Sequence, residues 1–171
     1  MNFISKRKSY FFIFFIFIFS VLINQYYGYI GVQPIDSFFS FNSGYDIYIG
    51  KFPFKDYWTI TGPFIDFIQS FFFWLFGVSW FSYVLHASIF NFIFAISTFF
   101  IFYKLNLNIN YCFLYAILVS ILAYPSAGTP YVDHQSAYLS IMGLYCFILA
   151  LVKNSRINWF FLPIIFGVSF L

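Results

Sequence analysis

The chain has 171 residues, of which 63% are hydrophobic, 29% aromatic and only 8% charged, with a formal net charge of +3. This composition excludes a soluble globular domain, because long apolar runs can keep their backbone hydrogen-bonded only as helices in a bilayer. The few basic residues flank apolar segments, so the positive charge does not indicate nucleic-acid binding.

The first apolar segment runs from Tyr10 to Tyr27 and follows the basic residues Lys6, Arg7 and Lys8. A positive flank predicts a cytoplasmic N-terminus. A signal peptide is the alternative, but no small-x-small cleavage site follows the apolar core. We therefore expect an uncleaved first span, with the next segment on the outer side of the membrane.

Residues 31–80 form the predicted first outer loop, and the polar part of this loop ends near Gly62 and Pro63. Its many Phe and Tyr side chains favour short helices on the membrane surface. The stretch from Phe64 to Tyr103 could cross the membrane once or twice. We predict a surface helix over Phe64–Gly77, a break at Gly77 and Ser79, and one span over Phe81–Tyr103.

Charge decides this choice, because a single crossing places most basic residues on the cytoplasmic side. The next span then begins at Leu105 or Tyr111 and ends at Tyr124. A second outer loop covers about residues 125–135, and Ser136–Val152 returns to the cytoplasm. The six basic residues expected inside are Lys6, Arg7, Lys8, Lys104, Lys153 and Arg156.

A fifth apolar segment starts at Trp159 and continues to Leu171. The predicted fold class is therefore all-α: a polytopic transmembrane helical bundle of about four complete spans and a truncated fifth. We expect residues 1–171 to be the N-terminal part of one larger transmembrane domain. The two cysteines, Cys112 and Cys146, lie in apolar segments and are expected to be buried thiols.

The acidic residues are all Asp, and this threading places every one of them at the outer side. They are Asp36, Asp46, Asp56, Asp66 and Asp133. Carboxylates are costly near lipid, so their collection on one side indicates a functional site. Asp46 and Asp66 are expected to be exposed on surface helices. His86, near the outer end of the second span, is expected to pack as a hydrogen-bonded residue.

An early Asp in the first outer loop is followed by a Gly-x-x-Pro-aromatic-basic-Asp-aromatic element. In this chain the element is Gly50, Lys51, Phe52, Pro53, Phe54, Lys55, Asp56, Tyr57 and Trp58. This arrangement resembles the GT-C class of polytopic membrane glycosyltransferases, which includes protein O-mannosyltransferases and the enzymes that add aminoarabinose or galacturonic acid to lipid A. The resemblance covers about residues 10–150. The family motif opens with Asp-Glu, whereas Asp36 is followed here by Ser37.

The resemblance implies an inverting hexosyl- or pentosyltransferase of the plasma (inner) membrane that acts on the cell envelope or lipopolysaccharide. Its donor would be a polyprenyl-phosphate-linked sugar, and its acceptor a lipid, glycan or protein at the outer face. It assigns Asp36 as the catalytic base. A helix cap is the structural alternative for Asp36. The runner-up functions are a non-catalytic transporter or flippase of polyprenyl-linked sugars, and an O-antigen polymerase or ligase-type protein.

Substrate or phosphate binding is expected at Lys51, Lys55, Asp56, Asp133 and His134. A lipid phosphate that leaves the sugar needs positive charge or a metal beside it. Asp133 can orient the imidazole of His134, and the two together could ligate a divalent metal. For Asp56, a role in holding its own loop through backbone amides is the alternative.

Overall fold

The computed structural model describes residues 3–32, 36–59, 62–124 and 127–170, and these residues form seven α-helices. The helices are α1 (Phe3–Ile30), α2 (Asp36–Tyr48), α3 (Phe64–Phe76), α4 (Trp80–Lys104), α5 (Ile109–Leu122), α6 (Val132–Lys153) and α7 (Arg156–Ser169). No strand occurs in these ranges; one isolated bridge joins Pro53 and Tyr57. The all-helical fold class is thereby confirmed.

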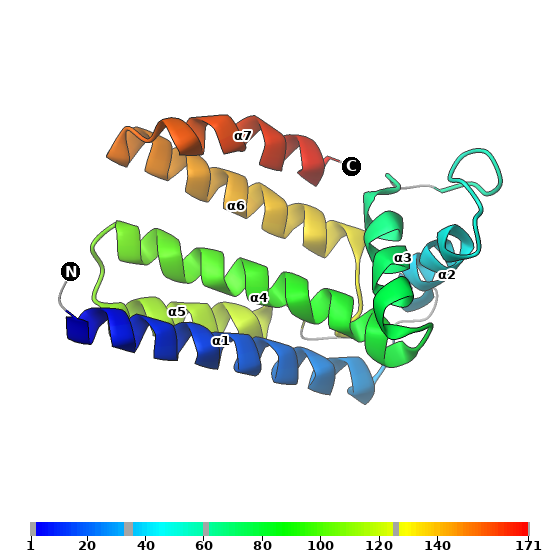
Figure 1. Ribbon diagram of the computed structural model, residues 1–171, viewed down its shortest axis with the longest axis horizontal. Helices are drawn as coiled ribbons and strands as arrows, with labels where there is room; N and C mark the ends of the chain where they lie inside the picture. The colour runs from blue at the N-terminus through cyan, green and yellow to red at the C-terminus, as the bar shows by residue number, and fades with distance from the viewer. Residues whose placement is uncertain (1–2, 33–35, 60–61, 125–126, 171) are drawn as a thin grey trace.

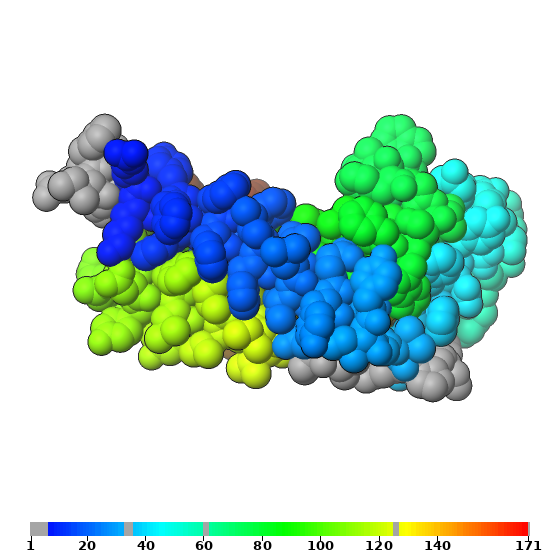
Figure 2. All heavy atoms as spheres, turned by 90° about the horizontal axis from the view of Figure 1, so that it is seen from below, coloured from blue at the N-terminus to red at the C-terminus, as the bar shows by residue number. Residues whose placement is uncertain are grey.

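The helices α1, α4, α5, α6 and α7 run along the long axis of the bundle, and α2 and α3 lie across one end of them (Figure 1). Along the chain, α1, α4, α5, α6 and α7 alternate in direction. The connections therefore gather at two ends. One end holds the N-terminus and the α4–α5 and α6–α7 turns, and the other holds α2, α3 and the α5–α6 connection. From below, α1 lies beside α5, with α2 and α3 at one end (Figure 2).

Among the described residues, three helical stretches are long and apolar enough to cross a membrane: Arg7–Ile30, Trp80–Lys104 and Val132–Lys153. The expected number was four complete spans and a truncated fifth. The helices α5 and α7 have 14 residues each, which is about 21 Å at 1.5 Å per residue. The hydrocarbon core is about 30 Å thick. The polar turn before Asn108, which caps α5, shortens this helix at its start.

The predicted break between the crosswise helix and the second long helix is confirmed at Gly77 and Ser79. Gly77 has a positive φ of 78°, and its N–H donates to the carbonyl of Phe73. Ser79 caps α4: its side chain accepts the N–H of Ser82, and the Ser82 side chain accepts the N–H of Ser79. The chain can therefore end α3, which lies across the end of the bundle, and restart as α4 along the bundle (Figure 1).

Helix α4 is the centre of the bundle and packs against α1, α3, α5 and α6. Small and polar side chains hold the helices together at buried positions. The hydroxyls of Ser20 and Ser120 lie 2.7 Å apart, and Asn91 Nδ2 donates to the Ser120 carbonyl at 2.9 Å. Such interhelical hydrogen bonds compensate for the missing hydrophobic contrast between helices and lipid.

Candidate functional site

All five Asp residues belong to the end of the bundle that α2 and α3 cover (Figure 1). Asp36 begins α2, Asp46 lies near its end and Asp133 is in the first turn of α6. The opposite end carries Lys104, Lys153 and Arg156. The fold thus agrees with the expectation that the carboxylates share one end, whereas their side of a membrane stays a prediction.

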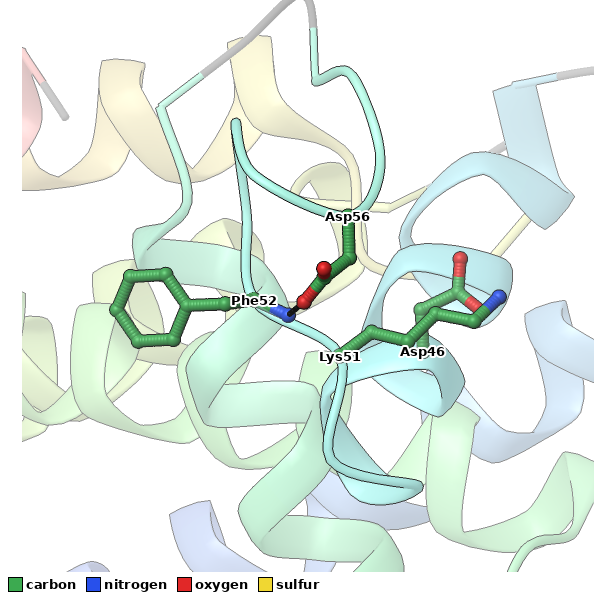
Figure 3. Close-up of polar contacts among 4 residues, drawn as sticks. All are labelled: Asp46, Lys51, Phe52 and Asp56. Atoms are coloured by element: carbon green, nitrogen blue, oxygen red, sulfur yellow. Dashed lines mark hydrogen bonds and ion pairs between the residues drawn. The ribbon is translucent and has the colours of Figure 1, made fainter.

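The first polar loop is held by its own side chains (Figure 3). Asp56 Oδ2 accepts the backbone N–H of Phe52 at 2.8 Å, and the Asp56 N–H donates to the Phe52 carbonyl at 2.9 Å. These two bonds are the loop-holding role expected as the alternative for Asp56. They close a tight turn around Phe54, whose φ is 64°.

Of the two lysines expected to bind phosphate, one has an internal partner. Lys51 Nζ lies 2.8 Å from Asp46 Oδ1, and the two form an ion pair at the protein surface. Lys55 is exposed on the same loop. An ammonium that already faces a carboxylate neutralises a phosphate less effectively, so Lys55 is the better placed of the two cations.

Asp66 contradicts the prediction that it is exposed, because its side chain is only 1% exposed. It lies on the inner face of α3, where Oδ2 accepts the Tyr57 hydroxyl at 3.3 Å. Oδ1 has no partner among the described residues. Burial raises the Asp66 pKa to about 7, against a smaller lowering by the Tyr57 hydrogen bond. This carboxylate can therefore gain or lose a proton near neutral pH.

The buried position of Asp66 follows from helix spacing that the sequence analysis did not use. Ile65, Gln69 and Phe73 are also buried, and with Asp66 they lie three to four residues apart on one face of α3. The many Phe residues of this segment make its sequence apolar around the whole helix, so the mixed polar face was not recognised. The available signal was the pair of Asp66 and Gln69, two polar residues three positions apart within an otherwise apolar helix.

Residues 127–130 of the predicted second outer loop are buried. Asn24 Nδ2 of α1 donates to the Gly128 carbonyl at 2.9 Å, and the Tyr83 hydroxyl of α4 donates to the Pro130 carbonyl at 3.4 Å. Gly128 has a φ of 63°, and a Cβ there would lie 2.3 Å from the backbone nitrogen of Gly28. The loop therefore closes the end of the bundle.

A small cavity of about 10 Å³ lies where this loop meets the start of α2. Its lining residues are Asp36, Ser37, Tyr124, Ala127, Gly128, Thr129, Tyr131 and His134. Thr129 Oγ1 donates to Ser37 Oγ at 3.3 Å, which ties the loop to α2. The volume is close to that of one water probe, about 10 to 15 Å³. Asp36 itself is exposed and borders this cavity.

The side chains of Asp36 and Asp133 both influence Tyr131, which lies at the start of α6. The negative charge of Asp133 is the largest cause that raises the Tyr131 pKa, and the charge of Asp36 contributes to the same shift. Two Asp residues far apart in the sequence therefore lie near one tyrosine. This places the proposed base and one proposed binding residue in the same part of the molecule.

Asp133 and His134 do not form the pair that the sequence suggested. His134 turns toward aromatic rings, with its centroid 5.5 Å from Tyr124 and 5.3 Å from Tyr131. Its Nδ1 is buried without a partner among the described residues. Asp133 is exposed and lines a different cavity. Adjacent residues on a helix point about 100° apart, which explains the separation.

A chain of buried polar side chains crosses three helices beneath this surface. His86 Nδ1 of α4 lies 2.9 Å from Gln69 Oε1 of α3, and Gln135 Nε2 of α6 lies 3.1 Å from His86 Nε2. His86 is thus the hydrogen-bonded packing residue that the sequence predicted. Its partners Gln69 and Gln135 were not predicted, because residues on three different helices give no local sequence signal.

The sequence suggested that Asp133 and His134 could together ligate a divalent metal. Within the described ranges, no group of three or more His, Cys, Asp or Glu side chains could hold a metal ion. Asp133 and His134 also line different cavities. A metal at this pair therefore stays a prediction.

The residues of this end come from α2, α3, α6 and both polar connections, so the site is built by tertiary structure rather than by one motif. Comparisons of the chain with protein-family models, with curated proteins and with solved structures found no significant match.

Proposed function

We propose that the chain is part of a membrane glycosyltransferase that transfers a sugar from a polyprenyl-phosphate carrier at the outer membrane face. One observation carries the proposal: every carboxylate lies at one end of an apolar helical bundle. Such an end offers acid–base groups at the depth where the phosphate of a membrane-anchored donor would lie. The resemblance of the Gly50–Trp58 element to GT-C enzymes supplies the reaction type.

Asp36 is the proposed general base. It is exposed at the start of α2 and therefore accessible to an acceptor hydroxyl. In the proposed step, the acceptor oxygen forms a bond to the anomeric carbon while its proton passes to Asp36. The bond between that carbon and the carrier phosphate breaks, and the phosphate leaves with the electron pair.

The leaving phosphate needs compensation of its growing negative charge. Lys55 is the candidate cation for this role, because it is exposed and Lys51 is already paired with Asp46. Asp56 supports this assignment indirectly. Its hydrogen bond to Phe52 fixes the turn that carries Lys55.

The test is sugar transfer from a polyprenyl-phosphate donor in membranes that contain the protein. Asp36→Asn keeps the side-chain size and removes the charge, so we expect a loss of transfer of about 100-fold or more with unchanged protein level. Asp46→Asn is the matched control, because Asp46 is a carboxylate of the same helix that faces Lys51. Wild-type transfer by the Asp36→Asn variant would remove Asp36 from the mechanism.

A flippase gives a different result in the same membranes. It would move the carrier lipid between leaflets without forming a glycosylated product, and the Asp36→Asn change would then have no transfer reaction to affect. Carrier movement without any transfer by the wild-type protein would therefore contradict the transferase proposal.

A further inference from the structure

A second and larger cavity, of about 270 Å³, lies between the starts of α3 and α6 and the end of α7. These three segments come together at the end of the bundle that holds the Asp residues and is covered by α2 and α3, which we call the carboxylate end (Figure 1). The volume is close to the lower limit of small-molecule sites, about 300 Å³. Asp36 does not line this cavity, so it is separate from the proposed catalytic region.

The polar side chains of this cavity are acceptors of hydrogen bonds. Asp133 supplies an exposed carboxylate. Gln135 is 1% exposed, its Nε2 lies 3.1 Å from His86 Nε2, and its Oε1 is buried inside the protein and does not open into the cavity. The Ser136 hydroxyl donates its hydrogen to the Ser169 carbonyl, so it can only accept a further hydrogen bond.

The remaining lining is mainly apolar apart from Ser169, whose hydroxyl donates to the Phe166 carbonyl, and no described residue of the lining carries a positive charge. The apolar residues are Phe64, Ile65, Val132, Leu139, Val168 and Phe170. A negative charge beside acceptors and apolar walls favours a cation with several N–H groups and an apolar body. A neutral polyol would also donate hydrogen bonds, but it would leave the carboxylate charge unbalanced.

We propose that the cavity between α3, α6 and α7 binds the protonated amine of an amphiphilic molecule through the carboxylate of Asp133. The amine could belong to a soluble molecule or to a lipid headgroup. The inference does not rest on the transferase reaction, because its residues are not those of the proposed chemical step.

The test measures binding of benzylammonium, benzyl alcohol and methyl glucoside to the detergent-solubilised full chain by calorimetry. Benzylammonium should bind at least tenfold more tightly than either neutral probe. Asp133→Asn should abolish this preference, Asp133→Glu should retain it, and Asp46→Asn should leave it unchanged. If Asp133→Asn does not fold, the binding of the three probes to the wild-type protein still tests the proposal.

Equal binding of the amine and the alcohol, tighter binding of the glucoside, or an amine preference that survives Asp133→Asn would each overturn the proposal. Bilayer nanodiscs separate the two sources of the amine. Weaker benzylammonium binding in phosphatidylethanolamine than in phosphatidylcholine, which has the same net charge and no N–H group, would assign the site to a lipid headgroup, and equal binding would assign it to a soluble amine. Loss of transfer in Asp36→Asn with intact amine binding would keep the two proposals distinguishable.

Discussion

The two polar connections at the carboxylate end have opposite environments. The first, around Lys51–Trp58, is largely exposed and is held by contacts four or five residues apart in the sequence. The second, at residues 127–130, is buried and is held by contacts to α1, α2 and α4. Proline occurs in both, whereas charged and aromatic side chains occur only in the first. The charges of the first connection agree with its exposure, and the burial of the second depends on partners in other helices.

One hydrogen bond joins the exposed connection to the interior, and the pH dependence of stability tests its environment. Tyr57 of that connection donates to buried Asp66, whose pKa is raised from 3.8 to about 7. Below pH 4 both the folded and the unfolded state hold the proton. Between pH 4 and 7 the unfolded state loses it first, so the free energy of unfolding should fall, by up to about 4 kcal/mol.

Above pH 7 both states are ionised, and this contribution should stay constant. Denaturation of the wild-type protein and of Asp66→Asn in detergent across pH 4–8 measures the effect. The Asn variant should lose the pH dependence and be the more stable of the two at pH 8. An identical pH profile for both proteins would show that Asp66 is hydrated.

Gly128 gives the clearest test of the buried connection. An alanine Cβ there would meet the Gly28 backbone at 2.3 Å in addition to requiring a φ of 63°. We expect Gly128→Ala to lower the free energy of unfolding by about 3 kcal/mol. Gly50→Ala is the matched control in the exposed connection, because its φ is 91° and no atom lies within 4 Å of the added Cβ.

The control should cost only the backbone strain of about 1–2 kcal/mol. Thermal denaturation of both variants in the same detergent gives the comparison. Equal losses for Gly128→Ala and Gly50→Ala would mean that the second connection does not pack on α1.

The smallest effect is expected at the surface ion pair of the first connection. Lys51→Ala removes the contact with Asp46 and should lower the free energy of unfolding by about 0.2–1 kcal/mol, less at high salt. Lys55→Ala serves as the control, since Lys55 forms no ion pair among the described residues. A loss above 2 kcal/mol would show that this connection depends on its salt bridge more than an exposed pair allows.

Local patterns predicted the helices and their directions well. Runs of apolar residues and the Gly77–Ser79 break located α4 close to its observed bounds, and charge placement grouped the connections at two ends. The start of α5 was left open between Leu105 and Tyr111, because hydropathy does not show that Asn108 caps the helix. Capping depends on a side-chain hydrogen bond that a hydropathy pattern cannot include.

The candidate site was predicted only in part. The sequence predicted the role of Asp56 in its own turn as one of two alternatives, because this role depends on neighbouring residues. The base role of Asp36 stays a prediction. The sequence missed the burial of Asp66 and the Gln69–His86–Gln135 chain, which arise when three helices meet. Long-range contacts of this kind need the tertiary structure, since no residue in the contact is near the others in sequence.

Cysteine labelling measures the central claim that the carboxylate end faces outside and the opposite end faces the cytoplasm. In a protein with Cys112 and Cys146 replaced by alanine, single cysteines would be placed at Lys55 on one end and at Asn108 and Asn154 on the other, all exposed positions. In intact cells an impermeant thiol reagent should label only Lys55→Cys. After permeabilisation all three should react. Labelling of Asn108→Cys or Asn154→Cys from outside, or protection of Lys55→Cys, would contradict the account.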